Sequence, residues 1–263
     1  MFSSDRSHFA AQTEESLPFR VEIASREQLQ EVADLRAATY GKHLPALGAL
    51  LSRPEPADVA LGCEVFVARS KLDGSLLGTL RTHANVDKPL PLQASLELPE
   101  RFRGTRMVET TRLCVKGSSG ASVVRSALFK AMHQYCLDQN VEWMLAAARR
   151  PVDRIHDSLL FVDVKESRVY YPMAHAGGVP HRVMYMSTTD MRRQWKECQH
   201  ILYRFAYDTY HPDIDIALAQ DLSGYWDCIS TNTGASVTYL PERVPKAQQP
   251  AHYESSRPMA LVA

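Results

Sequence analysis

The order of hydrophobic and polar positions predicts a strand, a helix and a hairpin in the first third of the chain. Residues 19–24 alternate as a strand does, and Ser25 with Gln28 predicts a capping box for a helix that runs to Tyr40. Two further alternating runs, CEVFVARS and SLLGTLRTH, flank an Asp-Gly turn, which is a strong signal for a β-hairpin. This order of elements is typical of an α/β domain.

The middle of the chain continues with a connection that contains prolines (84–106) and a strand, VETTRLCV (108–115). A loop rich in glycine and serine follows, and an apolar stripe then predicts a helix over 122–140. The continuous apolar run 141–148 predicts a strand that is covered on both faces. A short helix and two strands, SRVYYPMA and HRVMYMS, complete a mixed central sheet with flanking helices, so the predicted fold class is α/β (α+β).

The two ends of the chain are less regular than its middle. A helix from residue 188 or 189 to about 207 and another near 213–221 are expected after the sheet. Polar, aperiodic residues precede the first strand, and prolines and glutamines fill the last part of the sequence. The predicted units are a mobile leader (1–18), an α/β core (19–187), a helical extension packed on the core (188–239) and a disordered tail (240–263).

Composition limits the classes of function that the chain can have. The 263 residues include 30 basic and 30 acidic side chains, and this balance argues against nonspecific nucleic-acid binding and an electrostatic membrane anchor. The five cysteines are odd in number and show no paired spacing, which predicts free thiols in a reducing compartment. No run approaches the roughly 20 apolar residues of a membrane span. We therefore expect a cytoplasmic protein without a metal site.

The strand VETTRLCV carries two opposite charges, Glu109 and Arg112. Three positions apart, they point to opposite faces of a regular strand. A β-bulge would bring both to one face and leave backbone N–H groups unpaired beside them, where these could stabilise a developing oxyanion. The alternative is that each charge has its own buried ion-pair partner.

The loop KGSSGAS (116–122) joins this strand to the next helix. A glycine–serine loop at a helix N-terminus presents backbone N–H groups that can bind phosphate or pyrophosphate. The sequence matches neither the P-loop nor the dinucleotide fingerprint, and a flexible connector is the alternative.

Strand, Glu-x-x-Arg pair, loop and apolar helix together resemble the core of the GNAT acyltransferase superfamily. VETTRLCV is most similar to the corresponding strand of N-acyl amino acid synthases of the FeeM type and, more distantly, of N-acyl-homoserine-lactone synthases. The family's acidic pair before the hairpin and its Gly-x-x-Arg in the second hairpin strand correspond to Glu55, Asp58, Gly78 and Arg81. The resemblance covers about residues 19–187 and implies a GNAT-like core.

Three features depart from the family pattern. No tryptophan precedes Trp143, whereas homoserine-lactone synthases carry one soon after the first helix. The loop KGSSGAS keeps only part of the RGxGxG pattern of GNAT enzymes. His156 stands where these enzymes have a tyrosine.

The resemblance implies transfer of an acyl group, expected to be long, from acyl-acyl carrier protein or acyl-CoA to the amine of an amino acid or similar molecule. The donor's phosphopantetheine or pyrophosphate would rest on backbone amides at the end of the strand and in the loop. The implied donor-binding residues are Cys114, Val115, Lys116, Gly117, Ser118, Ser119, Gly120 and Ala121.

The resemblance also implies roles for single side chains. Glu109 is the candidate base for the amine, Arg112 and Arg81 are candidates to hold an acceptor carboxylate, and His156 is a candidate to protonate the leaving thiolate. Asp58 is a candidate to position the amine. The alternatives are a structural ion pair for Glu109, solvent exposure for Arg81 and Asp58, and a helix-surface position for His156.

Arg149, Arg150 and Arg154 form a basic cluster after the apolar strand 141–148. The cluster could steer an acidic acyl carrier protein, or it could be an ordinary solvated surface. The apolar strand would form one wall of the acyl channel. Two other functions stay open: acetylation of a small amine from acetyl-CoA, and binding of an acyl thioester without catalysis.

Overall fold

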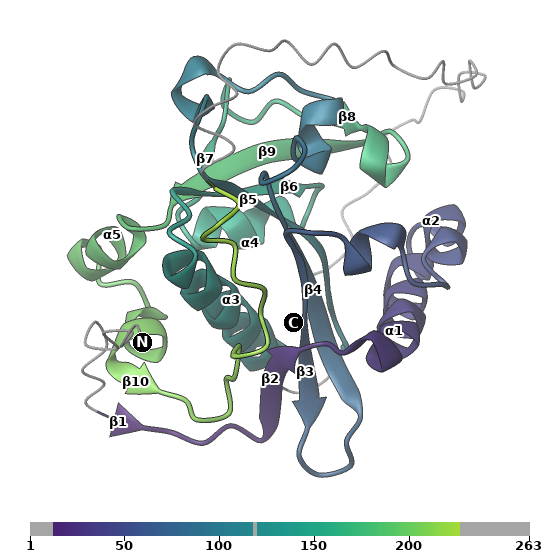
Figure 1. Ribbon diagram of the computed structural model, residues 1–263, viewed down its shortest axis with the longest axis vertical. Helices are drawn as coiled ribbons and strands as arrows, with labels where there is room; N and C mark the ends of the chain where they lie inside the picture. Colours follow the sequence, from purple (N-terminus) through teal and green to yellow (C-terminus); the bar gives the residue numbers. More distant parts are fainter. Residues whose placement is uncertain (1–12, 118–119, 227–263) are drawn as a thin grey trace, which may run out of the picture. The chain divides into compact units, whose positions relative to one another are not determined.

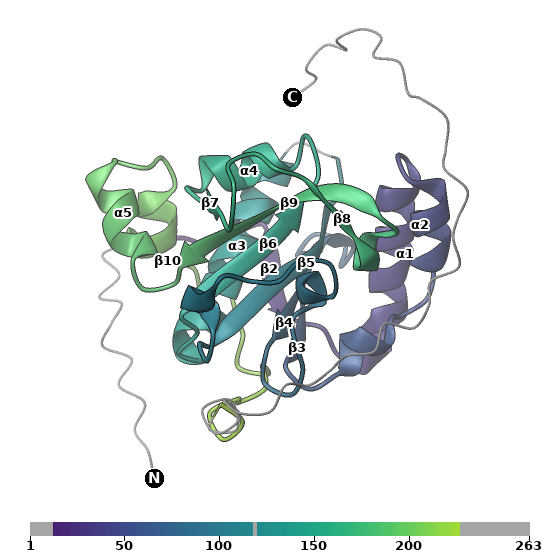
Figure 2. The ribbon, with the colours of Figure 1, turned by 90° about the horizontal axis from the view of Figure 1, so that it is seen from above.

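The computed structural model describes residues 13–117 and 120–226, all of which lie in one structural unit, 1–233. A mixed β-sheet runs through these residues, with helices on both of its faces (Figures 1 and 2). The predicted disordered tail (240–263), Ser118, Ser119 and the first part of the expected leader lie outside the described residues.

The strands of the sheet pair with antiparallel neighbours except at its centre, where β5 and β6 are parallel. In spatial order they are β2 (Phe19–Ile23), β3 (Cys63–Ser70), β4 (Leu76–Ala84), β5 (Met107–Val115), β6 (Trp143–Ala148), β9 (Val179–Ser187) and β7 (Val162–Asp163), with β8 (Tyr171–Met173) paired to β9. The predicted hairpin β3–β4 is confirmed, and its turn places Gly74 at φ +70°.

One face of the sheet packs on α3 (Ala121–Asp138), which connects the parallel strands β5 and β6. The alternate residues Phe66 and Ala68 of β3 lie in the core on this side. Gly78 of β4 allows α3 to approach closely, because a Cβ atom there would lie 3.0 Å from a methyl group of Val124.

The opposite face is covered by α1 (Leu29–Gly41), α2 (Pro45–Leu50) and several short 3₁₀ turns. Val65 and Val67, which alternate with the α3-facing residues of β3, pack against α1 here. Figure 1 shows α3 and the α1–α2 pair on opposite sides of β3 and β4. The turns are η2 (Arg26–Gln28), η3 (Pro56–Val59), η4 (Pro91–Ala94), η5 (Glu100–Phe102) and η6 (Ala174–Ala176). The predicted capping box of Ser25 is present.

Strand β5 has two irregularities that matter for the site. Its register with β4 shifts between Thr79 and Arg81, so Arg112 and Leu113 oppose a single residue of β4, and Arg112 has φ +54°. This is a β-bulge, as considered from the sequence. Pairing with β6 ends at Thr110 and Ala146, although β5 continues to residue 115 and β6 to residue 148. Beyond this point β5 is paired with β4 alone.

The C-terminal part differs from the expected long helices. The helix expected from 188 or 189 to 207 is wrong: α5 (Met191–Glu197) is short and Gln199 adopts φ +51°, before a π-helical turn, η7 (Arg204–Asp208). The expected helix at 213–221 is absent, since Asp213 and Asp215 instead exchange backbone hydrogen bonds with Val21 of β2. These bonds to a strand edge replace the bonds that a helix would make within itself.

Residues 13–18 of the expected leader are fixed by contacts with distant parts of the chain. β1 (Thr13–Glu14) pairs with β10 (Thr209–Tyr210), and Leu17 is buried in the core. Within the described ranges, no helix combines the length and the apolar character needed to cross a membrane.

Candidate active site

A cluster of five charged side chains lies between the sheet and the covering helices, on the face opposite α3. Asp58 is at its centre: Oδ1 accepts hydrogen bonds from Arg36 at 2.7 Å and from Arg81 at 2.9 Å, and Oδ2 accepts one from the Glu55 amide. Glu55 accepts two hydrogen bonds from the Arg112 guanidinium, at 2.9 and 2.7 Å, and one from Arg81 at 3.0 Å. We call these residues the paired cluster.

The paired cluster contradicts the alternative that Arg81 and Asp58 are exposed to solvent. Arg81 and Asp58 are buried and bond to each other, so neither is a solvated surface residue. Burial by itself would raise the pKa of Glu55, but the hydrogen bond from Arg112 and the charge of Arg81 lower it to about 2. Three guanidinium groups face two carboxylates, and Nε and Nη2 of buried Arg36 have no partner among the described residues. The cluster therefore carries an excess of one positive charge.

His83 connects this cluster to the sheet. Nε of Arg81, which always carries a proton, lies 3.0 Å from His83 Nε2, so this ring nitrogen is the acceptor and Nδ1 carries the ring proton. His83 Nδ1 lies 3.1 Å from the Cys63 sulfur, and Thr111 Oγ1 lies 3.1 Å from Nε2. Burial, together with the charge of Arg81, lowers the pKa of His83 to about 3 and keeps the ring neutral.

Glu109 lies on the same face of β5 but does not join the paired cluster. Its side chain is 0 % exposed, and Oε2 accepts a hydrogen bond of 2.8 Å from the backbone N–H of Leu92 in η4. Oε1 is buried and has no hydrogen-bond partner in the described part of the chain. Burial raises the pKa of Glu109 to about 8, against the smaller opposing effect of the Leu92 hydrogen bond. The alternative of a structural ion pair for Glu109 is not observed, because Arg81 and Arg112 bind Glu55.

His175 in η6 lies close to the open oxygen of Glu109. Its Nε2 lies 3.9 Å from Glu109 Oε1, and its side chain is 20 % exposed. Burial and the charge of Arg112 lower the pKa of His175 to about 4. We call Glu109 and His175 the open pair. No pattern in the sequence points to His175, which a β-hairpin brings over β5 from a turn-rich segment.

The predicted donor site follows β5 directly. Lys116 and Gly117 leave the strand, Gly120 adopts φ +93° at the N-cap of α3, and Ala121 begins the helix. Among the strand residues, Val115 is half-buried and Cys114 is buried against α1, where burial raises the thiol pKa to about 12. The Cys114 side chain is thus part of the core beneath α1.

His156 lies on α4 (Asp153–Ser158) and is buried, so the alternative of an exposed helix-surface histidine is not observed. Its ring packs edge-on against Phe161, and Nδ1 lies 3.4 Å from the carbonyl of Val152. Burial lowers the pKa of His156 to about 4, and the ring is therefore neutral at neutral pH.

The three arginines after β6 are held differently from one another. Arg150 donates a hydrogen bond of 2.8 Å to the Tyr170 hydroxyl and packs on its ring, and that hydroxyl donates to Asp153. Arg154 is exposed, and Arg149 is half-buried. Arg150 is therefore fixed at the surface while Arg154 is free to contact a partner.

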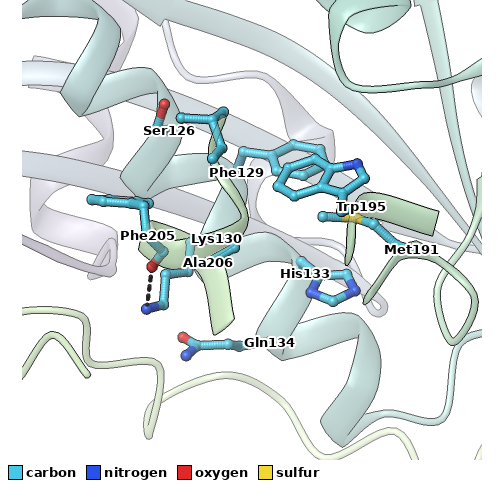
Figure 3. A pocket seen from close by; sticks show the side chains of 10 residues that line it. Ser126, Phe129, Lys130, His133, Gln134, Met191, Trp195, Phe205 and Ala206 are labelled. Atoms are coloured by element: carbon cyan, nitrogen blue, oxygen red, sulfur yellow. Dashed lines mark hydrogen bonds between the residues drawn. The ribbon is translucent and has the colours of Figure 1, made fainter. Parts of the chain in front are cut away.

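A small pocket lies on the other side of the molecule, between α3 and the C-terminal segment (Figure 3). Lys130 Nζ donates hydrogen bonds to the carbonyls of Phe205 and Thr209 beside it. Neither residue of the open pair lines this pocket, and its walls are mainly aromatic and aliphatic. Its contacts attach the C-terminal segment to α3.

The match to known families covers the whole of this site. A family model described as N-acyl amino acid synthase FeeM matches residues 32–184, which is more than half of the chain. This span contains the paired cluster, the open pair and the predicted donor loop. No curated protein matches the sequence.

Two solved structures share the fold at low sequence identity. FeeM, an N-acyl amino acid synthase from uncultured soil microbes, superposes with a TM-score of 0.52 and 13% identity, covering 71% of this chain and 99% of its own. BjaI, a CoA-dependent acyl-homoserine lactone synthase solved with SAM and isopentyl-CoA, gives a TM-score of 0.55 and 14% identity, covering 80% and 99%. The predicted GNAT-like fold is confirmed.

Proposed function

Since the chain belongs to the N-acyl amino acid synthase FeeM family and is an N-acyltransferase, we propose that it moves a long acyl chain from a thioester to the amine of an amino acid. The thioester is acyl-acyl carrier protein or acyl-CoA, and the acceptor is an amino acid or a similar small amine. Membership of a transferase family leaves the non-catalytic alternative without support.

The observation that carries the proposal is the state of Glu109. A fully buried carboxylate with one oxygen free of partners among the described residues is poised to accept a proton. Its raised pKa of about 8 makes the ionised carboxylate a stronger base than an ordinary glutamate and narrows the gap to the pKa of the acceptor's ammonium group. Glu109 can therefore deprotonate the attacking amine near neutral pH.

An acceptor with a carboxylate is supported by the charge of the paired cluster. Three arginines and two carboxylates leave one positive charge unmatched, and two nitrogen atoms of Arg36 are buried without partners in the described residues. A carboxylate would supply both the missing charge and the missing hydrogen-bond acceptors. Arg112 and Arg81 would then act through a cluster that already orients their guanidinium groups.

The donor site is supported by the end of β5. Past Thr110 this strand no longer pairs with β6, and the glycine-containing loop with the start of α3 follows it. The peptide groups of a strand edge and of a helix N-terminus can bind pantetheine amides and phosphate. BjaI was solved with isopentyl-CoA, which supports a donor of this chemical type, and the exposed Arg154 suits an acidic carrier protein. The free thiols of the described cysteines fit a cytoplasmic enzyme.

His156 is not suited to act as an imidazolium acid. With a pKa of about 4 it is neutral at neutral pH and has no labile proton for a leaving thiolate, and its Nδ1–H faces the Val152 carbonyl. Thiols have a pKa of about 8.5, and the thiolate can depart without full protonation.

The test is mass spectrometry of lipid extracts from cells that overproduce either the parent protein or Glu109→Gln. We expect new N-acyl amino acids with the parent and a loss of about 10²–10⁴-fold in the variant. Equal product from both proteins would overturn the role of Glu109. A parent without product, whose melting temperature rises with acetyl-CoA but not with long-chain acyl-CoA, would instead indicate short-chain acetylation.

A further inference from the structure

A buried base must return its proton to solvent after each turnover. Glu109 is 0 % exposed and lies beneath η4 and η6, so it has no direct contact with water at the surface. An amino-acid acceptor arrives mainly as an ammonium ion at neutral pH, and amide formation therefore releases one proton per cycle. If Glu109 collects that proton, as the proposed function requires, a second group must carry it out.

We propose that His175 relays this proton between Glu109 and solvent, an inference that rests on the proposed function. Its Nε2 lies 3.9 Å from Glu109 Oε1, while 20 % of its side chain is exposed. A distance of 3.9 Å is too long for a direct hydrogen bond, and one water molecule can bond to both atoms across it. His175 thus lies between the open oxygen and the surface, and because Nδ1 is buried without a partner among the described residues, Nε2 is the nitrogen that takes up and releases the proton.

The relay accounts for every proton and bond of the reaction. The ammonium gives one proton to the Glu109 carboxylate, and the free amine attacks the thioester carbonyl. The C–N bond forms as the C–S bond breaks, and the amine's second proton leaves with the thiol. Glu109 then passes the first proton to the lone pair of His175 Nε2, and the imidazolium releases it to water, so both side chains return to their starting states.

The surroundings of His175 suit a transient carrier. The cations Arg112 on β5 and Arg81 on β4, with His181 on β9 and His83 on β4, face it and favour the neutral ring, while η4 contributes no charge. The neutral ring has a lone pair for the proton, and its low pKa means that it holds the proton only briefly before giving it to water. The backbone carbonyl of His175 accepts a hydrogen bond from Arg112 at 3.4 Å, and the Ala174 amide bonds to Ser95, which fixes η6 over β5.

The experiment compares His175→Ala, His175→Gln and a matched control, His181→Gln, in one transferase assay. His181 is a neighbouring histidine whose ring centre lies 6.3 Å from that of His175, and its Nδ1 bonds to the Val179 carbonyl and not to Glu109. Palmitoyl-CoA and palmitoyl-acyl carrier protein are the donor probes, and a mixture of the proteinogenic amino acids is the acceptor probe. We expect the His175 variants to lose about 10–100-fold in kcat with KM unchanged, and the control to retain its kcat.

Added imidazole separates a relay from a structural role. The alanine variant leaves space for a free imidazole molecule, which should restore its kcat in proportion to concentration without affecting Glu109→Gln. Full activity of both His175 variants, or a loss that imidazole does not restore in a variant with the parent's melting temperature, would overturn the relay alone. A parent without transferase activity on either donor would overturn the proposed function, and with it the relay.

Discussion

Two buried polar groups lie side by side on one face of the sheet, and they differ in how their hydrogen bonds are used. In the paired cluster both carboxylates are bound by guanidinium groups at 2.7–3.0 Å. In the open pair, Glu109 has an oxygen without a partner in the described residues and faces a neutral histidine at 3.9 Å. β5 contributes one residue to each group, Arg112 to the paired cluster and Glu109 to the open pair, and its bulge lies at Arg112, which bonds to Glu55.

We propose that this difference separates the residues that position the site from those that take part in the reaction. In the paired cluster the bonds from Arg112 and the charge of Arg81 lower the pKa of Glu55, which keeps it charged, so it holds the arginines in position and does not exchange protons. A buried carboxyl group without such partners has a raised pKa and can change its charge near neutral pH. Substitutions in either group test this contrast, and we describe four measurements.

The largest effect on stability should come from the centre of the paired cluster. Asp58→Asn removes a charge that Arg36 and Arg81 share and leaves both guanidinium groups buried with too little negative charge. The free energy of unfolding, measured by urea titration, should fall by about 3–5 kcal/mol.

The control is Asp34→Asn on α1, where the carboxylate is exposed and accepts a hydrogen bond from Gln30. This change should stay within about 0.5 kcal/mol. Equal effects of the two substitutions would show that the paired cluster contributes no more to stability than a surface carboxylate does.

The second measurement is the stability of Glu109→Gln as a function of pH. Between the ordinary glutamate pKa of 4.5, which applies to the unfolded chain, and the folded value of about 8, native Glu109 keeps a proton that the unfolded chain has lost. The native state thus binds more protons, and this group's contribution to stability falls as pH rises through that range. Since one pKa unit is worth about 1.4 kcal/mol, the variant should gain a few kcal/mol over the parent by pH 8.

Glu64→Gln is the matched control, because burial also raises the pKa of Glu64, to about 7, and Glu64 lies on β3 whereas Glu109 lies on β5. It should show the same trend over a narrower pH range while leaving transferase activity intact. A stability difference between Glu109→Gln and parent that does not change with pH would contradict the raised pKa of Glu109.

Whether the sequence predicts a feature of this arrangement depends on how far apart in the sequence the contacting residues lie. The hairpin turn, the capping box and the strand character of β5 are local, and neighbouring residues predict all three correctly. The burial of Arg36 could have been predicted from the sequence, since Arg36 falls on the same face of α1 as the buried residues Val32 and Ala33. A charge on such a face needs a buried partner.

Other features depended on long-range contacts that no local pattern encodes. His175 reaches Glu109 only because β8 and β9 pair and place η6 over β5. The segment 213–221 has a pattern compatible with a helix, yet its backbone bonds to Val21, almost two hundred residues earlier in the sequence. In both cases tertiary pairing decides over local preference.

The third measurement is the pH dependence of kcat/KM. If the Glu109 carboxylate is the base, kcat/KM should rise about tenfold per pH unit below its pKa and level off near pH 8. Glu109→Asp should keep a rise of this kind at lower activity, whereas the residual activity of Glu109→Gln should lack it. A flat profile of the parent between pH 6 and 8 would assign the proton transfer to another group.

The smallest effect should come from Cys63, at the border between the two groups. Its sulfur accepts a hydrogen bond from His83 Nδ1–H. The other ring nitrogen, Nε2, accepts a hydrogen bond from Arg81. Cys63→Ala leaves a buried N–H without an acceptor and should cost about 1–3 kcal/mol in unfolding free energy, whereas Cys63→Ser keeps an acceptor and should cost less. Because the raised pKa of the thiol, about 11, excludes a nucleophilic thiolate near neutral pH, both variants should retain kcat. Loss of kcat in the folded serine variant would place Cys63 in the chemistry and move the boundary between scaffold and active site.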